Sequence, residues 1–279
     1  MPIDLTDRPI AIAGASSGIG LATALACAKA GMPVALGARR RDKLEQAADR
    51  VRAHGGSPSI HHLDVTDQTS CETFVREANE HHGPIYAAFA NAGFGEERAV
   101  LDTPLERARD MFETNFFGTL AVLHAAAPTM LDQRQGHLLI CSSCLALRPV
   151  PHYAMYSATK AAQHHLGQAL NVELDGTGVR CSTVHPVGTK TEFFDKAAKR
   201  SGGLKLTGGS DRFMQPPARV ADAIVRCLKK PRPEVWTDPG ARLGLPLSLL
   251  LPRTTAAVMK RLVAKRKQRR ADAPPHPPE

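Results

Sequence analysis

The sequence lacks the marks of an exported or membrane-spanning protein. Residues 1–8 contain two aspartates and no basic cluster in front of an apolar run, so they do not form a secretory signal. A membrane-spanning helix needs roughly 20 consecutive apolar residues. The most apolar stretch, residues 10–38, is interrupted by Lys29, Pro33 and five glycines. We therefore expect this stretch to form a strand, a turn, a helix and a second strand.

Disulfide bonds are also not expected. The sequence has six cysteines and no export signal, which favours reduced thiols and a cytoplasmic protein. Cys141-Ser-Ser-Cys144 has the C-x-x-C spacing of a redox motif. That motif belongs near the start of a helix, whereas here it closes an expected strand. We therefore assign it no redox role.

Acidic residues are absent from one long stretch near the C-terminal end. The formal net charge is +9, and residues 252–270 alone contain eight lysines or arginines and no acid. The basic character is thus a property of the tail and does not indicate a nucleic-acid-binding domain. No nucleic-acid partner is predicted.

Short apolar runs alternate with helical stretches along most of the chain. The expected strands are residues 9–15, 33–39, 59–65, 85–91, 137–143, 179–186 and 234–238. Among the expected helices are residues 18–30, 41–54, 67–81 and 217–229. Alternation of this kind produces right-handed βαβ units. The sequence predicts an α/β fold with a doubly wound, mostly parallel, seven-stranded sheet, helices on both faces and a basic helical extension at the C-terminal end.

A glycine-rich turn, Gly14-Ala-Ser-Ser-Gly18-Ile-Gly20, joins the first strand to its helix. Glycines at such a turn let the backbone approach a pyrophosphate, and the helix start offers unpaired N–H groups and a partial positive charge. The alternative, a glycine turn that holds no ligand, is the less favoured interpretation in this strand–turn–helix context.

The spacing G-x-x-x-G-x-G is followed by four further motifs in order: Asn91-Ala92-Gly93, Asn115 within an expected long helix, Ser143, and Tyr156-Ser-Ala-Thr-Lys160. Over roughly residues 8–240 the chain therefore resembles the short-chain dehydrogenase/reductase family. The resemblance implies a single Rossmann-like domain, a nicotinamide cofactor, and assembly as a homodimer or homotetramer. It implies no metal.

The end of the second strand indicates which nicotinamide cofactor is used. NAD enzymes place an acid about 20 residues past the glycines, where it binds the ribose 2′-hydroxyl. Here Ala38 is followed by Arg39, Arg40 and Arg41. No carboxylate at this position repels a 2′-phosphate, and the Arg39 guanidinium can donate two parallel hydrogen bonds to the phosphate oxygens. Arg41 is better explained as a solvated residue at the start of a helix. The sequence predicts NADP(H).

The resemblance assigns the remaining cofactor contacts. The predicted cofactor-binding residues are Gly14, Ser16, Ser17, Gly18, Ile19, Gly20, Arg39, Arg40, Asp64, Val65, Asn91, Ala92, Gly93, Tyr156, Lys160, Pro186, Thr189 and Thr191. Two positions depart from the family pattern. Ala13 replaces the usual Thr, which removes a hydroxyl, and Val187 replaces the usual Gly after Pro186, which restricts the backbone near the nicotinamide.

The predicted catalytic residues are Asn115, Ser143, Tyr156 and Lys160. Tyr156 and Lys160 are four residues apart in a helical segment, so they share one face. A free tyrosine has a pKa near 10, and a nearby ammonium favours its phenolate. By resemblance, Ser143 hydrogen-bonds the substrate oxygen, Tyr156 transfers the proton, Lys160 holds the nicotinamide ribose, and Asn115 anchors a water relay from Lys160 to solvent. Ser142 is the neighbouring candidate, but the spacing favours Ser143.

The substrate is less clearly indicated. Apolar side chains flank the catalytic motifs, at Cys144, Leu145, Leu147, Val150, Tyr153, Phe193 and Phe194. Packing explains them about as well as substrate binding does. No cluster of cations beyond Arg148 indicates an anionic substrate. The sequence predicts reduction of an apolar or lipid-like carbonyl, or oxidation of the matching secondary alcohol. The rival is a catalytically silent NADP-binding sensor or scaffold, which has no need of the four catalytic residues together.

We expect an NADP-binding catalytic domain over residues 1–240, with a mobile substrate loop at about 189–216. A Leu- and Pro-rich, then basic and amphipathic, extension follows at 241–270, and 271–279, with four prolines, is expected to be disordered. In the extension Val258, Met259, Leu262 and Val263 share one helix face. A basic amphipathic helix can lie weakly on an anionic membrane surface through residues 252–270. It can equally pack on the domain or fray, and the packed or frayed form is the favoured alternative.

Overall fold

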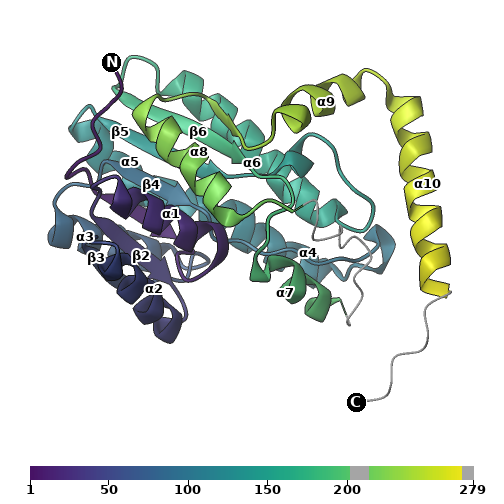
Figure 1. Cartoon of the computed structure of the whole chain (residues 1–279), viewed down its shortest axis with the longest axis horizontal. Coiled ribbons are helices and arrows are strands. Elements are labelled where there is room, and N and C mark those ends of the chain that lie inside the picture. Colours follow the sequence, from purple (N-terminus) through teal and green to yellow (C-terminus); the bar gives the residue numbers. More distant parts are fainter. Residues whose placement is uncertain (202–213, 272–279) are drawn as a thin grey trace.

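The computed structural model describes residues 1–201 and 214–271, and it contains one parallel sheet of seven strands (Figure 1). The strands are β1 (Ile10–Ala13), β2 (Val34–Ala38), β3 (Pro58–His62), β4 (Ala87–Ala90), β5 (Gly136–Cys141), β6 (Val179–His185) and β7 (Glu234–Trp236). Their order is β3-β2-β1-β4-β5-β6-β7, with all six pairings parallel. The predicted fold class is confirmed.

Helices cover both faces of this sheet. The α-helices of the described residues are α1 (Gly18–Lys29), α2 (Arg41–Ala53), α3 (Gln68–His82), α4 (Leu105–Phe112), α5 (Gly118–Asp132), α6 (Ala154–Glu173), α7 (Glu192–Arg200), α8 (Pro217–Lys229), α9 (Pro239–Leu249) and α10 (Pro252–Ala271). Leu44 of α2 and Ile224 of α8 belong to the core on one face. Phe74 of α3 and Val122 of α5 belong to the core on the other. Burial of these two apolar surfaces is the main stabilising contribution.

The strand order reverses between β1 and β4. From β1 the chain builds outward through β2 to β3, and from β4 it builds outward in the opposite direction to β7. In open parallel sheets the ligand crevice lies beyond the carboxyl ends of the strands at this switch point. The glycine-rich turn after β1 and the Asn91 segment after β4 both lie there.

Two expected segments differ from the structure. The stretch expected to be a mobile loop contains α7, which begins where the Thr191 side chain accepts a hydrogen bond from the backbone N–H of Phe193. Residues 202–213 of that stretch lie outside the described residues. Asn115 does not lie in a regular α-helix but in η2, a π-helical turn (Glu113–Phe117) between α4 and α5. Such turns redirect backbone groups away from the regular helix ladder.

The C-terminal extension forms α9 and α10, and α10 stands clear of the sheet and its covering helices (Figure 1). Val258 is exposed, so it does not pack on the domain, and the frayed alternative stays a prediction. The side chains of residues 262 and 263, and the tail 272–279, lie outside the described part. None of the helices in the described ranges combines the length and apolar character that a bilayer crossing requires.

Candidate active site

A cavity of about 510 Å³ opens at the switch point of the sheet. It is lined by Ser143, Tyr156 and Lys160 and by every predicted cofactor-binding residue except Gly20. Asn115 is the other predicted residue that does not line it. The structure therefore brings together residues from seven separate segments of the sequence around one space of ligand size.

The glycine-rich turn has the geometry of a phosphate cradle. Gly14 has a φ of +79°, in the left-handed region that favours glycine. A Cβ at Gly20 would lie 2.2 Å from the carbonyl oxygen of Gly14, so no larger residue fits there. Ser17, which precedes α1, makes no side-chain cap, so the first N–H groups of the helix have no partner from it. An anionic group fits this helix start.

Asn91 supports the turn from the neighbouring strand. Its Nδ2 donates to the carbonyl oxygens of Gly14 at 3.2 Å and Ala13 at 3.4 Å. Neither of these contacts depends on a hydroxyl at position 13, so Ala13 leaves them in place. Val187 likewise has no positive φ and its N–H donates to Thr237 Oγ1 at 3.4 Å. Ala13 and Val187, the two departures from the family pattern, therefore do not put the backbone around the cavity into an unusual conformation.

Two arginines follow β2 at one end of the cavity. Arg39 has a largely exposed side chain, with its Nη1 3.9 Å from Asp64 Oδ2. Arg40 donates from Nη2 to Ser16 Oγ at 3.3 Å and lies 3.7 Å from Glu192. Burial alone would raise the pKa of Asp64, but hydrogen bonds from Thr66 and the charge of Arg39 outweigh it and hold the pKa below its ordinary value. Cationic side chains thus flank this end of the cavity.

The two serines that follow β5 differ in the partners of their hydroxyl groups. Ser142 is buried, and its Oγ donates to the carbonyl oxygen of Lys160 at 2.9 Å. Ser143 Oγ accepts from the N–H of Leu145 at 3.1 Å, and the Ser143 side chain opposes part of the rise in the pKa of Tyr156. This arrangement agrees with the preference for Ser143.

Tyr156 and Lys160 lie on one face of the first turns of α6, as the spacing predicts. Lys160 is 4% exposed, its Nζ is 5.5 Å from the centre of the Tyr156 ring, and it donates to Cys141 O at 2.7 Å. Burial raises the pKa of Tyr156, and the hydrogen bond from Ser143 opposes it only in part. Burial also lowers the pKa of Lys160. In this structure burial, and not the ammonium, dominates the ionisation of Tyr156, so the neutral phenol is favoured.

Asn115 holds the segment that follows β4. Its side-chain Nδ2 donates to Phe94 O and Thr159 Oγ1, and its Oδ1 accepts from Phe94 N, all at 2.9–3.0 Å. Its backbone oxygen accepts from Thr119 Oγ1 at 2.8 Å and from Gln163 Nε2 at 2.7 Å. This backbone oxygen therefore has two donors, the hydroxyl of Thr119 and the amide of Gln163, and the water relay from Lys160 stays a prediction.

Gln163 is a site residue that sequence reasoning missed. It is fully buried, and its Oε1 accepts from Lys160 Nζ at 2.8 Å while its Nε2 also donates to Thr119 Oγ1 at 2.6 Å. The only sequence signal is an amide three residues after Lys160 on the same helix. It links Lys160 to the π-helical turn.

Replacing Gln163 by Leu is expected to lower the free energy of unfolding by about 1–3 kcal/mol. Lys160 Nζ and Asn115 O would each lose a buried partner, whereas leucine fills a similar volume. Chemical denaturation measures the change, and Gln135→Leu at an exposed position is the control. An unfolding free energy equal to that of the parent would show that these contacts contribute nothing.

Apolar side chains line the end of the cavity beyond Tyr156. Cys144, Leu145, Val150, Tyr153, Phe193 and Phe194 contribute, whereas Leu147 and Arg148 do not. The Phe193 ring lies 5.2 Å from that of Tyr156. Helix α7 also brings Lys196 and Arg200 to the cavity, with the Arg200 guanidinium 4.7 Å from the centre of the Phe94 ring. Sequence reasoning missed these two cations because it treated α7 as a loop.

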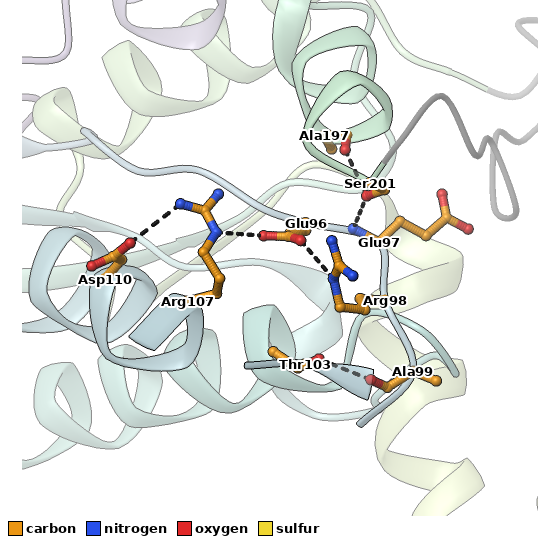
Figure 2. A network of polar contacts seen from close by, with 9 residues as sticks. All are labelled: Glu96, Glu97, Arg98, Ala99, Thr103, Arg107, Asp110, Ala197 and Ser201. Atoms are coloured by element: carbon orange, nitrogen blue, oxygen red, sulfur yellow. Dashed lines mark hydrogen bonds and ion pairs between the residues drawn. The ribbon is translucent and has the colours of Figure 1, made fainter. Parts of the chain in front are cut away.

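A polar network fixes α7 against the segment after β4 (Figure 2). The buried carboxylate of Glu96 accepts from Arg98 at 2.8 Å and from Arg107 of α4 at 3.2 Å. The N–H of Glu97 donates to Ser201 Oγ at 2.8 Å, and Ser201 Oγ donates to Ala197 O at 2.8 Å. The ion pair with Arg107 therefore ties the segment after β4 to α4, and the Ser201 hydrogen bonds tie the same segment to the end of α7.

The sequence profile described as short chain dehydrogenase matches residues 8–202. The chain belongs to the short-chain dehydrogenase/reductase family. An uncharacterized oxidoreductase of Listeria monocytogenes is 31% identical to this short-chain dehydrogenase/reductase over 229 residues, which are 81% of this chain and 92% of that protein. The protein is thus an oxidoreductase of a family whose fold binds a nicotinamide cofactor.

Solved structures agree with this assignment. An alcohol dehydrogenase of the archaeon Thermococcus sibiricus, complexed with 5-hydroxy-NADP, is 31% identical to this short-chain dehydrogenase/reductase; the match covers 82% of this chain and 95% of that one, with a TM-score of 0.71. A family member from Burkholderia phymatum in complex with NAD is 24% identical, covering 88% of this chain and 94% of that one, with a TM-score of 0.79. The second likeness supports the fold alone.

Proposed function

We propose that this short-chain dehydrogenase/reductase uses NADP(H) to transfer hydride between the nicotinamide and a carbonyl or secondary alcohol, with Tyr156 as the general acid and base. The observation that carries the proposal is that Ser143, Tyr156 and Lys160 line one cavity, with Lys160 Nζ 5.5 Å from the centre of the Tyr156 ring. The phosphate cradle of the glycine-rich turn, which lines the same cavity, supports the binding of a dinucleotide there.

In reduction, the Ser143 hydroxyl donates a hydrogen bond to the carbonyl oxygen and Tyr156 gives that oxygen its phenolic proton. Hydride for the carbonyl carbon is the chemistry that a bound nicotinamide supplies. The phenolate left on Tyr156 lies beside the Lys160 ammonium, which stabilises it until a proton from solvent restores the phenol. In alcohol oxidation the same groups act in reverse. Gln163 orients Lys160 throughout.

The choice of NADP over NAD rests on the residues after β2. Ala38 is buried and offers no acceptor for a ribose 2′-hydroxyl, whereas Arg39 and Arg40 line the same end of the cavity. A guanidinium binds phosphate oxygens with two parallel hydrogen bonds. The Thermococcus sibiricus relative, complexed with 5-hydroxy-NADP, favours the same choice.

NADPH is expected to bind at least about tenfold more tightly than NADH, and Arg39→Ala is expected to remove most of that difference by weakening NADPH alone. Fluorescence titration with both cofactors measures the affinities. Arg41→Ala is the matched control, because Arg41 pairs with Glu45 and does not line the cavity. Equal affinities of the parent protein for NADPH and NADH would overturn the assignment.

The apolar wall made by Leu145, Val150, Phe193 and Phe194 favours an apolar or lipid-like substrate. A panel of aldehydes and ketones of graded chain length, screened for NADPH consumption, tests the proposed reaction. Turnover that improves with apolar chain length supports it. NADPH binding without consumption by any carbonyl, or production from any alcohol, would favour the silent sensor instead.

A further inference from the structure

Four leucines form an apolar stripe at the C-terminal end of the described fold. Leu243 and Leu247 are four residues apart and share one face of α9, and Leu250 and Leu251 follow directly at its C-terminal end. In most globular proteins such a face is turned toward the core. Here the four leucines are 74%, 59%, 76% and 53% exposed. We call these four residues the leucine stripe.

The rest of the domain contacts α9 on a side other than that of the leucine stripe. Helix α9 contacts β7 and η3 (Cys144–Ala146), and Leu245, on the side away from the leucine stripe, is partly buried. Figure 1 shows α9 and α10 at the edge of the molecule, with α10 clear of the sheet. Nothing in the described part of the chain covers the stripe, and four large exposed apolar side chains gathered along the end of α9 mark an interaction surface.

The charge of this segment indicates what the surface binds. Residues 239–270 contain nine arginines or lysines and no acid. Arg242, Arg253, Lys260 and Arg261 are exposed. Like charges at this density oppose pairing of the segment with its copy in a second chain. An apolar helix face beside exposed cations and without acids is instead the pattern of a helix that lies in the surface of an anionic bilayer.

We propose that α9 and the beginning of α10 dock this protein on an anionic lipid bilayer. The leucine stripe enters the boundary between headgroups and acyl chains, and the exposed cations contact the lipid phosphates. Because α9 contacts η3, whose Cys144 and Leu145 line the cavity, docking holds the apolar end of the cavity beside the bilayer. The docking itself does not rest on the proposed reaction, and its test uses no turnover.

Vesicle cosedimentation tests the leucine stripe. The full-length protein is expected to bind vesicles of equal parts phosphatidylcholine and phosphatidylglycerol and not vesicles of phosphatidylcholine alone. Leu243→Gln with Leu247→Gln is expected to weaken this binding by at least about tenfold, because each leucine loses apolar burial in the bilayer. Leu131→Gln, at an exposed leucine of α5, is the matched control and should bind as the parent does. NADPH affinity unchanged in all three proteins confirms that they are folded.

A second set of variants tests the cations. Arg253→Gln, Lys260→Gln and Arg261→Gln together are expected to weaken anionic-vesicle binding by about tenfold or more and to reduce its dependence on salt. The control replaces three exposed cations of α8 and its C-cap, Arg226, Lys229 and Lys230, in the same way. Absence of binding to anionic vesicles, or binding that the leucine variant leaves unchanged, would overturn the proposal. A parent dimer that the leucine variant converts to monomer, without vesicle binding, would assign the stripe to a second copy of the chain.

Discussion

Tyr156→Phe is expected to lower turnover by about 10²–10⁴-fold while the fold and NADPH affinity survive. The substitution removes only the phenolic oxygen, which is the group proposed to exchange a proton with the substrate. Burial raises the pKa of this phenol, so the parent holds a neutral proton donor at the substrate position. Steady-state kinetics with the best carbonyl from the NADPH screen measure the loss, and it should appear in kcat.

Tyr153→Phe is the matched control for this variant. The two rings are 6.3 Å apart, both line the cavity, and the Tyr153 hydroxyl donates to Glu97 Oε2 at 3.4 Å. The control should retain kcat within about threefold, because that hydroxyl is not assigned a proton-transfer role. If Tyr156→Phe turns over substrate at the parent rate, the proposed acid–base role is wrong, whatever the cofactor.

Lys160→Ala is expected to lower turnover by about 10²-fold or more and also to weaken NADPH binding. The variant loses the charge that stabilises the Tyr156 phenolate and, by family resemblance, a contact to the nicotinamide ribose. It also leaves Cys141 O and Gln163 Oε1 without the donor they have in the parent. Stopped-flow turnover and fluorescence titration separate the two losses.

Lys190→Ala, at an exposed lysine near the cavity, serves as the control for Lys160→Ala. The defects of Tyr156→Phe and Lys160→Ala should not multiply in the double variant, because both act on one proton transfer. A Lys160→Ala protein that loses stability but keeps the parent kcat and NADPH affinity would assign Lys160 a structural role alone.

Most of the fold was predictable because it depends on local patterns. Helix α8 has the bounds 217–229 that its periodicity predicts, and Pro217 in its first turn marks its start. Strand β3 was expected to reach residue 65 but ends at His62, where its register with β2 ends at Ala38. The apolar run of β3 continues past His62, but the pairing with β2 ends at Ala38. The sequence of one strand does not show where the strand paired with it ends.

The cavity was predictable to the extent that its residues lie in contiguous motifs. Gly14, Ser16 to Ile19, Asn91 to Gly93 and Tyr156 with Lys160 line it as expected. Gln163 was missed because its role depends on the π-helical turn, which brings the backbone oxygen of Asn115 to α6. Lys196 and Arg200 were missed because a helix of nine residues lay within a stretch that shows no clean period.

Tracing deuterium from the nicotinamide tests the central claim most directly. The protein is incubated with NADPH carrying deuterium at one or the other C4 position, together with each carbonyl that supports NADPH consumption, and the alcohol product is examined by mass spectrometry. The account predicts one deuterium on the carbinol carbon from one of the two cofactor epimers, and far less product with Tyr156→Phe. An alcohol product that contains no deuterium from either epimer would contradict hydride transfer at this site.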